Sequence, residues 1–536
     1  MSKQPILPPG PPDFPFAWEE PADAELSWEF DNMHCPTALA PLAADYLQAI
    51  AQGFEYRYFR LDQPIQILAR VWNGYGYFGV RFGVPEADRP AMFERVIDAR
   101  RRLIATTADY WTGRAIPELR ESYAAVDAVD VQGMEPERLA AAWDAAWERI
   151  YRAWRIHFFV ITGAYQALDD LAERYEALVP GAPPGDALRL IQGNVTELQD
   201  VGEGLEQLTD LAADDPATAA WLRDGAHGDP PAETPFAVAL DDYLDRHGHL
   251  GQGWDDLQLA SWREEPRRLL SDVAKRLDQP SERAADRRRR LAEEAEALHQ
   301  ELRARLADRP EELAEFEELL GHARDIGPIT ETHNYWIDRM AQACLRRFVV
   351  RIGHRLVALG AFDRADDVFY LRKTEVRDLL GDPQDRTELI ERRRLEHARQ
   401  RRITPPRWVG MPPDEGGSGR FETPEAIAQV PDEVRGVGAS AGVARGPARV
   451  ALGEADFDRI QRGDVIVCPS SNPSWVPLFS IAAGLVTDTG GVLSHAAVVA
   501  REFGLPAVVG TRDATTRIAD GRMVEVDGAT GIVRLL

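Results

Sequence analysis

Apolar residues recur every three or four positions through most of the chain between residues 86 and 400. The spacing is clearest in LAAAWDAAWERIYRAWRIHFFVITGAYQALDDLAERY (139–175) and in RMAQACLRRFVVRIGHRLVAL (339–359). A repeat near 3.6 residues places these side chains on one face of an amphipathic helix. The pattern therefore predicts a mainly α-helical body.

One segment of this region has a different pattern. In PIQILARVWNGYGYFGVRF (64–82), β-branched and aromatic residues flank Asn73-Gly74, a dipeptide that favours a two-residue hairpin turn. The segment predicts a small β hairpin, and no other clear strand pattern precedes residue 430.

Residues 281–320 are unusually charged, with leucine and alanine on one narrow face. We expect an exposed helical hairpin here, and a helix that docks a partner is the less favoured alternative. The arginine run 287–290 precedes glutamates about one helical turn away, which is typical of a solvated face.

Proline and glycine divide the 536-residue chain into parts. Prolines crowd the first 25 residues, where they favour an extended arm. Pro405-Pro406, Pro412-Pro413 and DEGGSGRFETPE predict a flexible linker at 403–434. Short β-type runs with one helix at 494–503 follow. We therefore expect a multidomain protein: a helical domain at 1–402 with the proline-rich arm, the linker, and a C-terminal β/α domain at 435–536.

Composition excludes several classes of protein. A net charge of -26 and a pI near 4.9 disfavour a nucleic-acid partner, because binding a polyanion requires clustered Lys and Arg. Cys35, Cys344 and Cys468 have no CxxC spacing, so we expect neither disulfides nor a zinc site. The longest apolar stretch, 475–486, is too short to span a membrane. We expect a cytoplasmic protein.

The chemistry-bearing candidate is TDTGGVLSHAAVVAREFGLPAVVG (487–510). Gly490 and Gly491 allow a tight turn, Ser494 is a favoured N-cap residue, and His495 then lies in the first helical turn. Unpaired N–H groups and the helix dipole favour an anion there and disfavour an imidazolium, so His495 could accept a phosphoryl group. Taken alone, these residues favour an ordinary structural histidine.

This segment, with 435–450, 463–479 and 520–536, resembles the swivelling phosphohistidine domain of the phosphoenolpyruvate-utilising enzymes. The resemblance implies that His495 carries a phosphoryl group and that Gly490, Gly491 and Ser494 bind the phosphate. Leu493 stands where many members have threonine. An apolar residue at this position is more like rifampin phosphotransferase, and in type the chain is also close to the phosphohistidine subunit of phenylphosphate synthase.

Segments 247–270, 331–339 and 360–376 resemble, more loosely, the helical domain that binds an alcohol or phenol acceptor in those enzymes. An acceptor hydroxyl needs a proton acceptor within reach, and an aromatic acceptor needs apolar walls. The resulting candidates for substrate binding are His34, Trp72, Tyr75, His249, Glu331, His333 and Asp338. For Trp72 and Tyr75, with Trp28 and Tyr77, core packing is the commoner role. His247 and His249 lack a third ligand at fixed spacing, so no metal site is predicted.

No glycine-rich, lysine-bearing nucleotide loop precedes residue 430, and the chain ends after the β/α domain. The resemblance then implies a phosphotransferase of the AMP-forming dikinase type. A separate ATP-grasp subunit would bind ATP and Mg²⁺ and load His495, and a small hydroxyl compound would be the acceptor. Two alternatives stay open: a phosphohistidine carrier or regulatory binding protein, and a synthetase that phosphorylates an acid.

Overall fold

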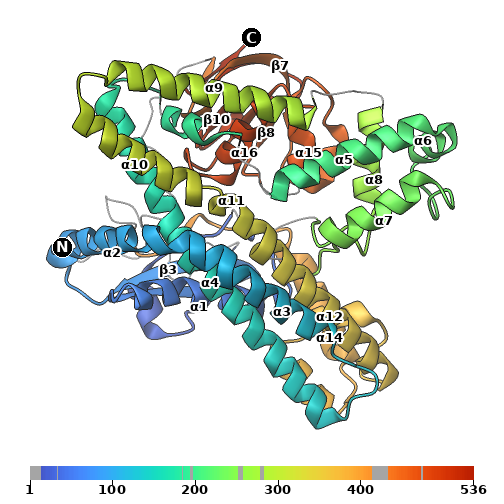
Figure 1. Cartoon of the computed structure of the whole chain (residues 1–536). Helices are drawn as coiled ribbons and strands as arrows, with labels where there is room; N and C mark the ends of the chain where they lie inside the picture. Colours follow the sequence, from blue (N-terminus) through green and yellow to red (C-terminus); the bar gives the residue numbers. More distant parts are fainter. Residues whose placement is uncertain are drawn as a thin grey trace. The chain divides into compact units, whose positions relative to one another are not determined.

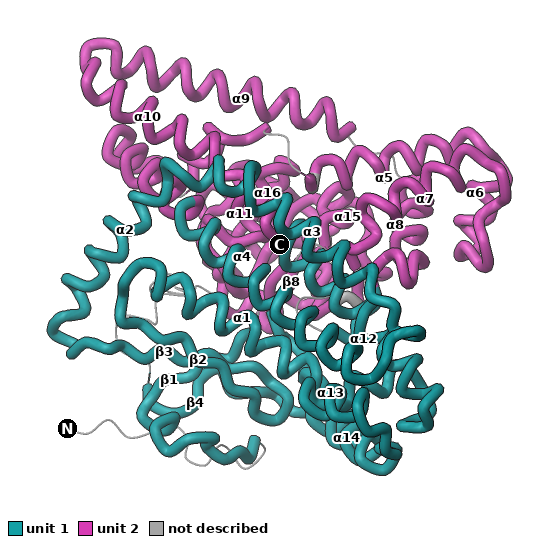
Figure 2. The backbone as a smooth tube through the Cα atoms, turned by 60° about the horizontal axis from the view of Figure 1, so that its bottom comes forward, with its two compact units in different colours: residues 1–163, 253–260, 336–419 teal, residues 164–252, 261–335, 420–536 magenta. Residues whose placement is uncertain are grey.

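The computed structural model describes residues 14–32, 34–183, 185–193, 197–251, 257–277, 283–412, 432–471 and 475–536. Two compact units divide the chain, and each combines segments distant in sequence (Figure 2). The first unit contains residues 1–163, 253–260 and 336–419, and the second contains 164–252, 261–335 and 420–536. Most elements are helices, and a β/α region occupies the C-terminal part of the sequence, so the predicted fold class is confirmed (Figure 1).

Helices of the first unit bury the apolar stripes of the sequence. Along the N-terminal part of α4, Trp143, Trp147 and Trp154 are buried, as their spacing predicts. The helices are α1 (Pro41–Arg60), α2 (Arg89–Tyr110), α3 (Ile116–Asp127), the first part of α4 (Pro136–Leu178), α12 (Met340–Ala358), α13 (Lys373–Gly381) and α14 (Thr387–Gln400).

A four-stranded sheet in the first unit contains the predicted hairpin. Strands β2 (Ile65–Trp72) and β3 (Tyr75–Phe82) pair antiparallel, with Trp72 opposite Tyr75 across the Asn73-Gly74 turn. Two further strands complete the sheet: β1 (Ser27–Phe30) pairs with β3, and β4 (Trp408–Gly410) pairs with β1. Both strands are too short to show an alternating pattern of their own.

Strand β4 lies inside the segment 403–434 that the sequence predicts as a linker. Of that segment, residues 413–431 lie outside the described residues, as do residues 1–13 of the N-terminal arm. The end of the arm is anchored, because Phe14 is fully buried against Tyr75 and Tyr77.

The helical part of the second unit includes the charged hairpin predicted at 281–320. Helices α9 (Ala284–Arg305) and α10 (Pro310–Ile326) form it, and His299 of α9 bonds Glu317 of α10 at 3.0 Å. The other elements are η4 (Asp186–Ile191), α5 (Glu197–Asp214), α6 (Pro216–Arg223), α7 (Pro235–His247), α8 (Arg267–Leu277) and α11 (Ile329–His333).

An eight-stranded sheet forms the centre of the C-terminal β/α region, in the order β5-β12-β11-β7-β8-β9-β10-β6. Neighbouring strands from β7 to β10 pair parallel, and the remaining pairs are antiparallel. The strands are β5 (Glu433–Arg435), β6 (Val437–Ser440), β7 (Val443–Val450), β8 (Val465–Cys468), β9 (Gly484–Thr487), β10 (Ala507–Val509), β11 (Met523–Asp527) and β12 (Ile532–Leu535).

The two edge strands of this sheet, β5 and β6, are consecutive in the chain and separated only by Gly436. Residues 433–440 therefore provide both edge strands, which brings the two ends of the sheet together. Two apolar clusters fill its faces: one includes α15 (Val476–Phe479) and α16 (His495–Phe503), and the other includes residues of α17 (Ala514–Arg517).

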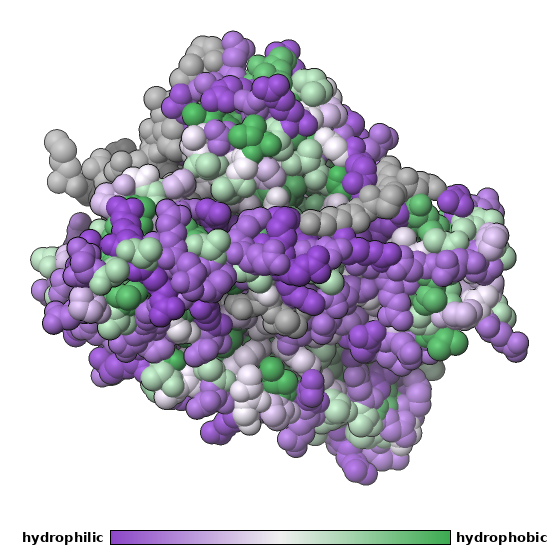
Figure 3. Space-filling view, turned by 45° about the horizontal axis from the view of Figure 1, so that its top comes forward, coloured by the Kyte–Doolittle hydropathy of each residue, from purple (hydrophilic) through white to green (hydrophobic). Residues whose placement is uncertain are grey.

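The surface agrees with the acidic composition. On the face in Figure 3, hydrophilic residues predominate and hydrophobic residues form small separate groups. Among the described residues, no helix is both long and apolar enough to cross a membrane. The three cysteines are buried and unbridged.

We predict that Gly528→Ala strongly destabilises the closed sheet. A Cβ at residue 528 would lie 1.8 Å from the carbonyl oxygen of Ser440, at the end of β6. Overpacking of this kind costs about 1–3 kcal/mol, and a backbone neighbour leaves little room to relax. Urea denaturation measures the loss. Gly453→Ala is the control, since a Cβ there meets nothing within 4 Å, and equal stability of both variants would contradict the prediction.

Candidate functional site

The N-terminus of α16 places His495 in the first helical turn, as the sequence predicts. Ser494 is the N-cap residue, and its side-chain oxygen accepts a hydrogen bond from the Ala497 N–H at 3.4 Å. Gly490 has a φ of +106°, which favours glycine, and a Cβ there would lie 2.7 Å from the Ser494 hydroxyl. By contrast, a Cβ at Gly491 would meet nothing within 4 Å.

The His495 ring contacts a carboxylate from another part of the second unit. Its Nδ1 lies 2.9 Å from the Glu331 Oε2, and both side chains are 7% exposed. An ionised carboxylate can only accept a hydrogen bond, so this contact places a proton on Nδ1. In the neutral ring the lone pair then lies on Nε2, which makes Nε2 the nucleophilic nitrogen.

A tight turn positions Glu331. Helix α11 follows α10 after Gly327-Pro328, and the Thr330 hydroxyl donates to the Gly327 carbonyl at 2.7 Å. A Cβ at Gly327 would lie 2.3 Å from the Ala323 carbonyl oxygen and 3.0 Å from Leu168. Because the turn leaves no room for a side chain at residue 327, its backbone geometry fixes the position of Glu331 on α11.

The C-terminal half of α16 packs against helices of the same unit. Arg501 is buried and donates to the Ala439 carbonyl at 2.8 Å, so its guanidinium binds the backbone of its own domain. Burial lowers the pKa of Arg501 to about 10, and burial raises the pKa of the neighbouring Glu502 to about 7. Gln192 donates to the Arg501 carbonyl at 3.1 Å, and Gln199 donates to Glu502 at 3.2 Å.

A pocket with a cavity volume of about 70 Å³ lies beside α16, several times the ~10–15 Å³ that one water requires. Its apolar walls include Leu168, Leu188, Val498 and Phe503, and Glu331 is among its polar lining residues. His495 does not line it. The pocket therefore adjoins the Glu331 carboxylate, which bonds His495 Nδ1.

Among the predicted substrate-binding residues of the second unit, Glu331 is the one whose contact with His495 is described. The Nδ1 of His333 lies 2.6 Å from the Ile329 carbonyl oxygen, one turn back in its own helix. His249 packs its ring edge-on against Tyr335, at 4.4 Å between centroids.

The other predicted residues belong to the first unit. His34 bonds Asp31 through Nδ1 at 2.9 Å, and Asp338 bonds His157 at 2.7 Å. Trp72 and Tyr75 are buried in the aromatic core around the small sheet, where the Tyr75 hydroxyl donates to the Ile403 carbonyl. For this aromatic pair the structure shows core packing, the commoner role weighed from the sequence.

Sequence reasoning missed the polar side chains that contact α16 from the helices, including Gln192, Gln199 and Arg287. The expectation that the arginine run 287–290 lies on a solvated face was wrong for Arg287, whose guanidinium lies 4.5 Å over the Phe503 ring. A charge pattern along one helix reveals neighbours on that helix alone. No local signal could identify Phe503 as the partner.

Two family models match the chain. Residues 460–531 match the mobile domain of PEP-utilising enzymes, and residues 157–331 match the fourth domain of rifampicin phosphotransferase. Residues 460–531 thus resemble the mobile domain of the PEP-utilising enzymes. The matched segments contain His495 and Glu331 respectively, so the two partners of the 2.9 Å contact come from the two matched domains. We refer to the C-terminal β/α region, residues 432–536, as the mobile domain.

Relatives of known name match longer stretches. Chondramide synthase cmdD of Chondromyces crocatus is 30% identical over 98% of this chain and 14% of its own length. Rifampicin phosphotransferase of Streptomyces sviceus is 30% identical over 71% of this chain and 44% of its own, and the uncharacterized phosphotransferase YvkC of Bacillus subtilis is 34% identical over 46% and 30%. The chain thus spans less than half the length of each of these relatives.

We predict that Ser494→Ala lowers the free energy of unfolding by about 1 kcal/mol, because the N-terminal N–H groups of α16 lose a capping partner. Thermal or urea denaturation measures the change. Ser494→Asp keeps an acceptor at the cap and should retain most of the stability. An alanine variant as stable as the parent would show that this cap does not stabilise α16.

Proposed function

We propose that this chain is a phosphotransferase component in which Nε2 of His495 carries a phosphoryl group from a donor site to an acceptor hydroxyl. The observation that carries the proposal is the 2.9 Å contact between His495 Nδ1 and Glu331 at the N-terminus of α16. This contact orients the ring, and the helix N-terminus favours the dianionic phosphoryl group. The match of residues 460–531 to the mobile domain of PEP-utilising enzymes supports the same assignment.

Loading forms a P–N bond at Nε2 while the P–O bond of the donor breaks and its oxygen leaves with the electron pair. The Nδ1 proton stays on the ring, shared with Glu331. In the second step an acceptor hydroxyl attacks phosphorus, a P–O bond forms, and the P–N bond breaks. Because Nδ1 is protonated, the ring leaves as neutral imidazole, a far better leaving group than an imidazolate anion.

Glu331 acts in this scheme as a positioning residue. It contacts Nδ1, whereas the acceptor must approach phosphorus beyond Nε2, on the other edge of the ring. The proton of the acceptor hydroxyl therefore goes to a different base. His249 and His333 of the second unit are the predicted candidates, and no described contact assigns the role.

We propose that a separate ATP-grasp subunit holds the donor site with its ATP and Mg²⁺. The resemblance to the phosphohistidine subunit of phenylphosphate synthase supports this placement. The overall reaction would consume ATP and water and yield AMP, phosphate and the phosphorylated acceptor. The acceptor would be a small phenol or alcohol, as the resemblance of the helical segments implies, and the reaction would take place in the cytoplasm.

A second candidate is a synthetase that phosphorylates an acid for condensation. It is supported by chondramide synthase, which matches 98% of this chain. The product separates the two, because an acyl phosphate reacts with hydroxylamine to give a hydroxamate and a phenyl or alkyl phosphate does not.

We predict that ATP labelled in its β or γ phosphoryl group, with an ATP-grasp protein of this family, labels the chain in an acid-labile, base-stable form. His495→Ala should abolish the label, and His333→Ala should retain it. Autoradiography of the separated chain measures both. Undiminished label in His495→Ala would overturn the proposed function.

We predict that Glu331→Gln slows discharge of loaded His495 by on the order of tenfold or more. An amide can donate to Nδ1 as well as accept from it, so it no longer keeps the proton on Nδ1. Hydrolysis of the labelled chain in buffer gives the rate, and ¹⁵N NMR of the unloaded ring reports its tautomer. Glu331→Asp keeps a carboxylate and should restore part of the rate. An unchanged tautomer and rate in Glu331→Gln would contradict the positioning role.

A further inference from the structure

Helix α8 presents one charged face whose function the sequence does not reveal. Arg268, Asp272, Lys275 and Arg276 stand at i, i+4, i+7 and i+8, a spacing that places them on the same side of a helix. Asp272 is buried, and burial raises the pKa of its carboxyl while the positive charges of the three cations lower it. We call these four residues the α8 face.

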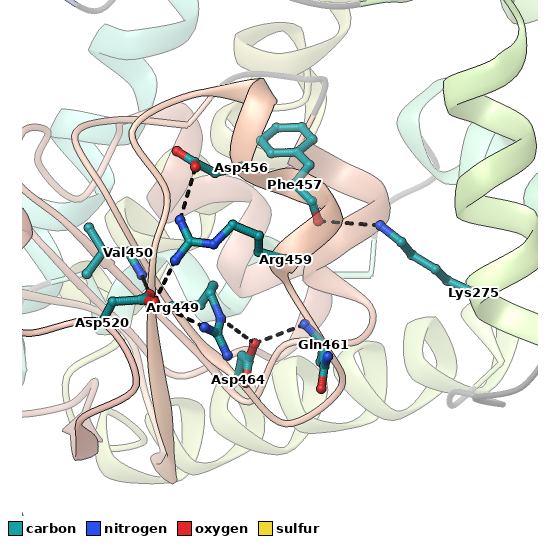
Figure 4. Close-up of polar contacts among 9 residues, drawn as sticks. All are labelled: Lys275, Arg449, Val450, Asp456, Phe457, Arg459, Gln461, Asp464 and Asp520. Carbon is teal, nitrogen blue, oxygen red and sulfur yellow. Dashed lines mark hydrogen bonds and ion pairs between the residues drawn. The ribbon is translucent and has the colours of Figure 1, made fainter.

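The cations of this face contact the mobile domain directly. Lys275 Nζ donates to the Phe457 carbonyl and to Asp458 Oδ1, each at 3.4 Å, and Figure 4 shows Lys275 reaching Phe457. The Arg268 guanidinium lies 4.4 Å over the Phe457 ring. Arg276 donates to the Pro477 carbonyl at 3.3 Å.

The segment that receives these contacts is held by its own ion pairs. It includes the turn η7 (Glu454–Arg459), where Arg459 bonds both Asp456 and Asp520 (Figure 4). Arg449 links Asp520 to Asp464, at 3.2 Å to each carboxylate. On its inner side, Phe457 packs edge-on against Trp475, with 4.5 Å between the ring centroids. The receiving surface is therefore a preorganised part of the mobile domain.

The contacts of the α8 face suit a reversible attachment. Asp458 is 78% exposed and Lys275 is 24% exposed, so water competes for this pair and its net contribution is small. The cation–π contact between Arg268 and the Phe457 ring adds a modest attraction. None of the four residues lines the pocket beside Glu331.

We propose that the α8 face is a latch that holds the mobile domain in the pose where His495 meets Glu331, and that opening this latch controls how often His495 becomes accessible to a phosphoryl donor. The inference rests on the proposed carrier role of His495. In the latched pose the His495 side chain is 7% exposed, so a donor reaches Nε2 only after the mobile domain has moved away. Weakening the latch therefore increases loading and shortens the time available for discharge beside Glu331.

The test uses the full chain and potassium phosphoramidate, a small reagent that phosphorylates histidine without a protein donor. Lys275→Glu places a carboxylate against Asp458 and should raise the rate of His495 labelling several-fold. Adding Asp458→Lys to that variant reverses both charges and should return the rate toward that of the parent. Labelling of His495 is followed by mass spectrometry of the peptide, with thermal denaturation to confirm an intact fold.

Arg267→Ala is the matched control, because Arg267 is an exposed neighbour on α8 outside the α8 face. It should leave the labelling rate unchanged. A second variant, Arg268→Ala, removes the cation over Phe457 without introducing repulsion and should raise the rate in the same direction as Lys275→Glu.

Equal labelling rates in the parent, Lys275→Glu and Arg268→Ala would overturn the latch. A rise in Arg267→Ala as large as in the latch variants would overturn it as well, because the effect would then be unspecific. Failure of the carrier role is a separate result: it appears as no label from ATP and an ATP-grasp protein, whereas labelling by phosphoramidate still reports whether α8 limits access to His495.

Discussion

The hydrogen bond from His495 Nδ1 to the Glu331 carboxylate joins the ring of His495, in the mobile domain, to the helices of the second unit. A neutral histidine ring has two nitrogens, and its hydrogen-bond partners decide which of them carries the proton. Glu331 makes that decision from α11, a different element far away in sequence. The chemistry proposed for Nε2 thus depends on whether the mobile domain lies against α11, because the carboxylate does not travel with the ring.

The contrast with Leu493 explains why a distant carboxylate is needed. Where many members of the family have a threonine hydroxyl two residues before the histidine, this chain has an apolar side chain that packs with the helical residues of the second unit. A local hydroxyl would stay with the ring in every pose of the domain. Glu331 can bond the His495 ring only when the mobile domain lies against α11, so the orientation of the ring depends on the position of the domain.

Local patterns predicted most of the fold. The stripes of α4 and α12, the hairpin at Asn73-Gly74, the charged hairpin α9 and α10, and the start of α16 at His495 all follow from spacing, turn chemistry and caps. Strands β1 and β4 were missed, since strands of four and three residues carry no alternation and form only where a neighbouring strand offers a pairing edge.

The His495 motif was equally visible in sequence, whereas its pairing with Glu331 was not. The two residues are 164 positions apart, and helix periodicity says nothing about tertiary neighbours. The same limit applies to Arg287 and to the α8 face, whose charges are indistinguishable in sequence from a solvated helix surface.

The closure of the mobile-domain sheet at Gly436 has a consequence for a domain that leaves its neighbours. An open sheet would present an unpaired row of N–H and C=O groups whenever the domain moved, and such edges recruit strands from other chains. Here both ends of the sheet are supplied by β5 and β6, two halves of one short stretch. A mobile domain that moves away would therefore present two short edge strands of three and four residues rather than one long unpaired edge.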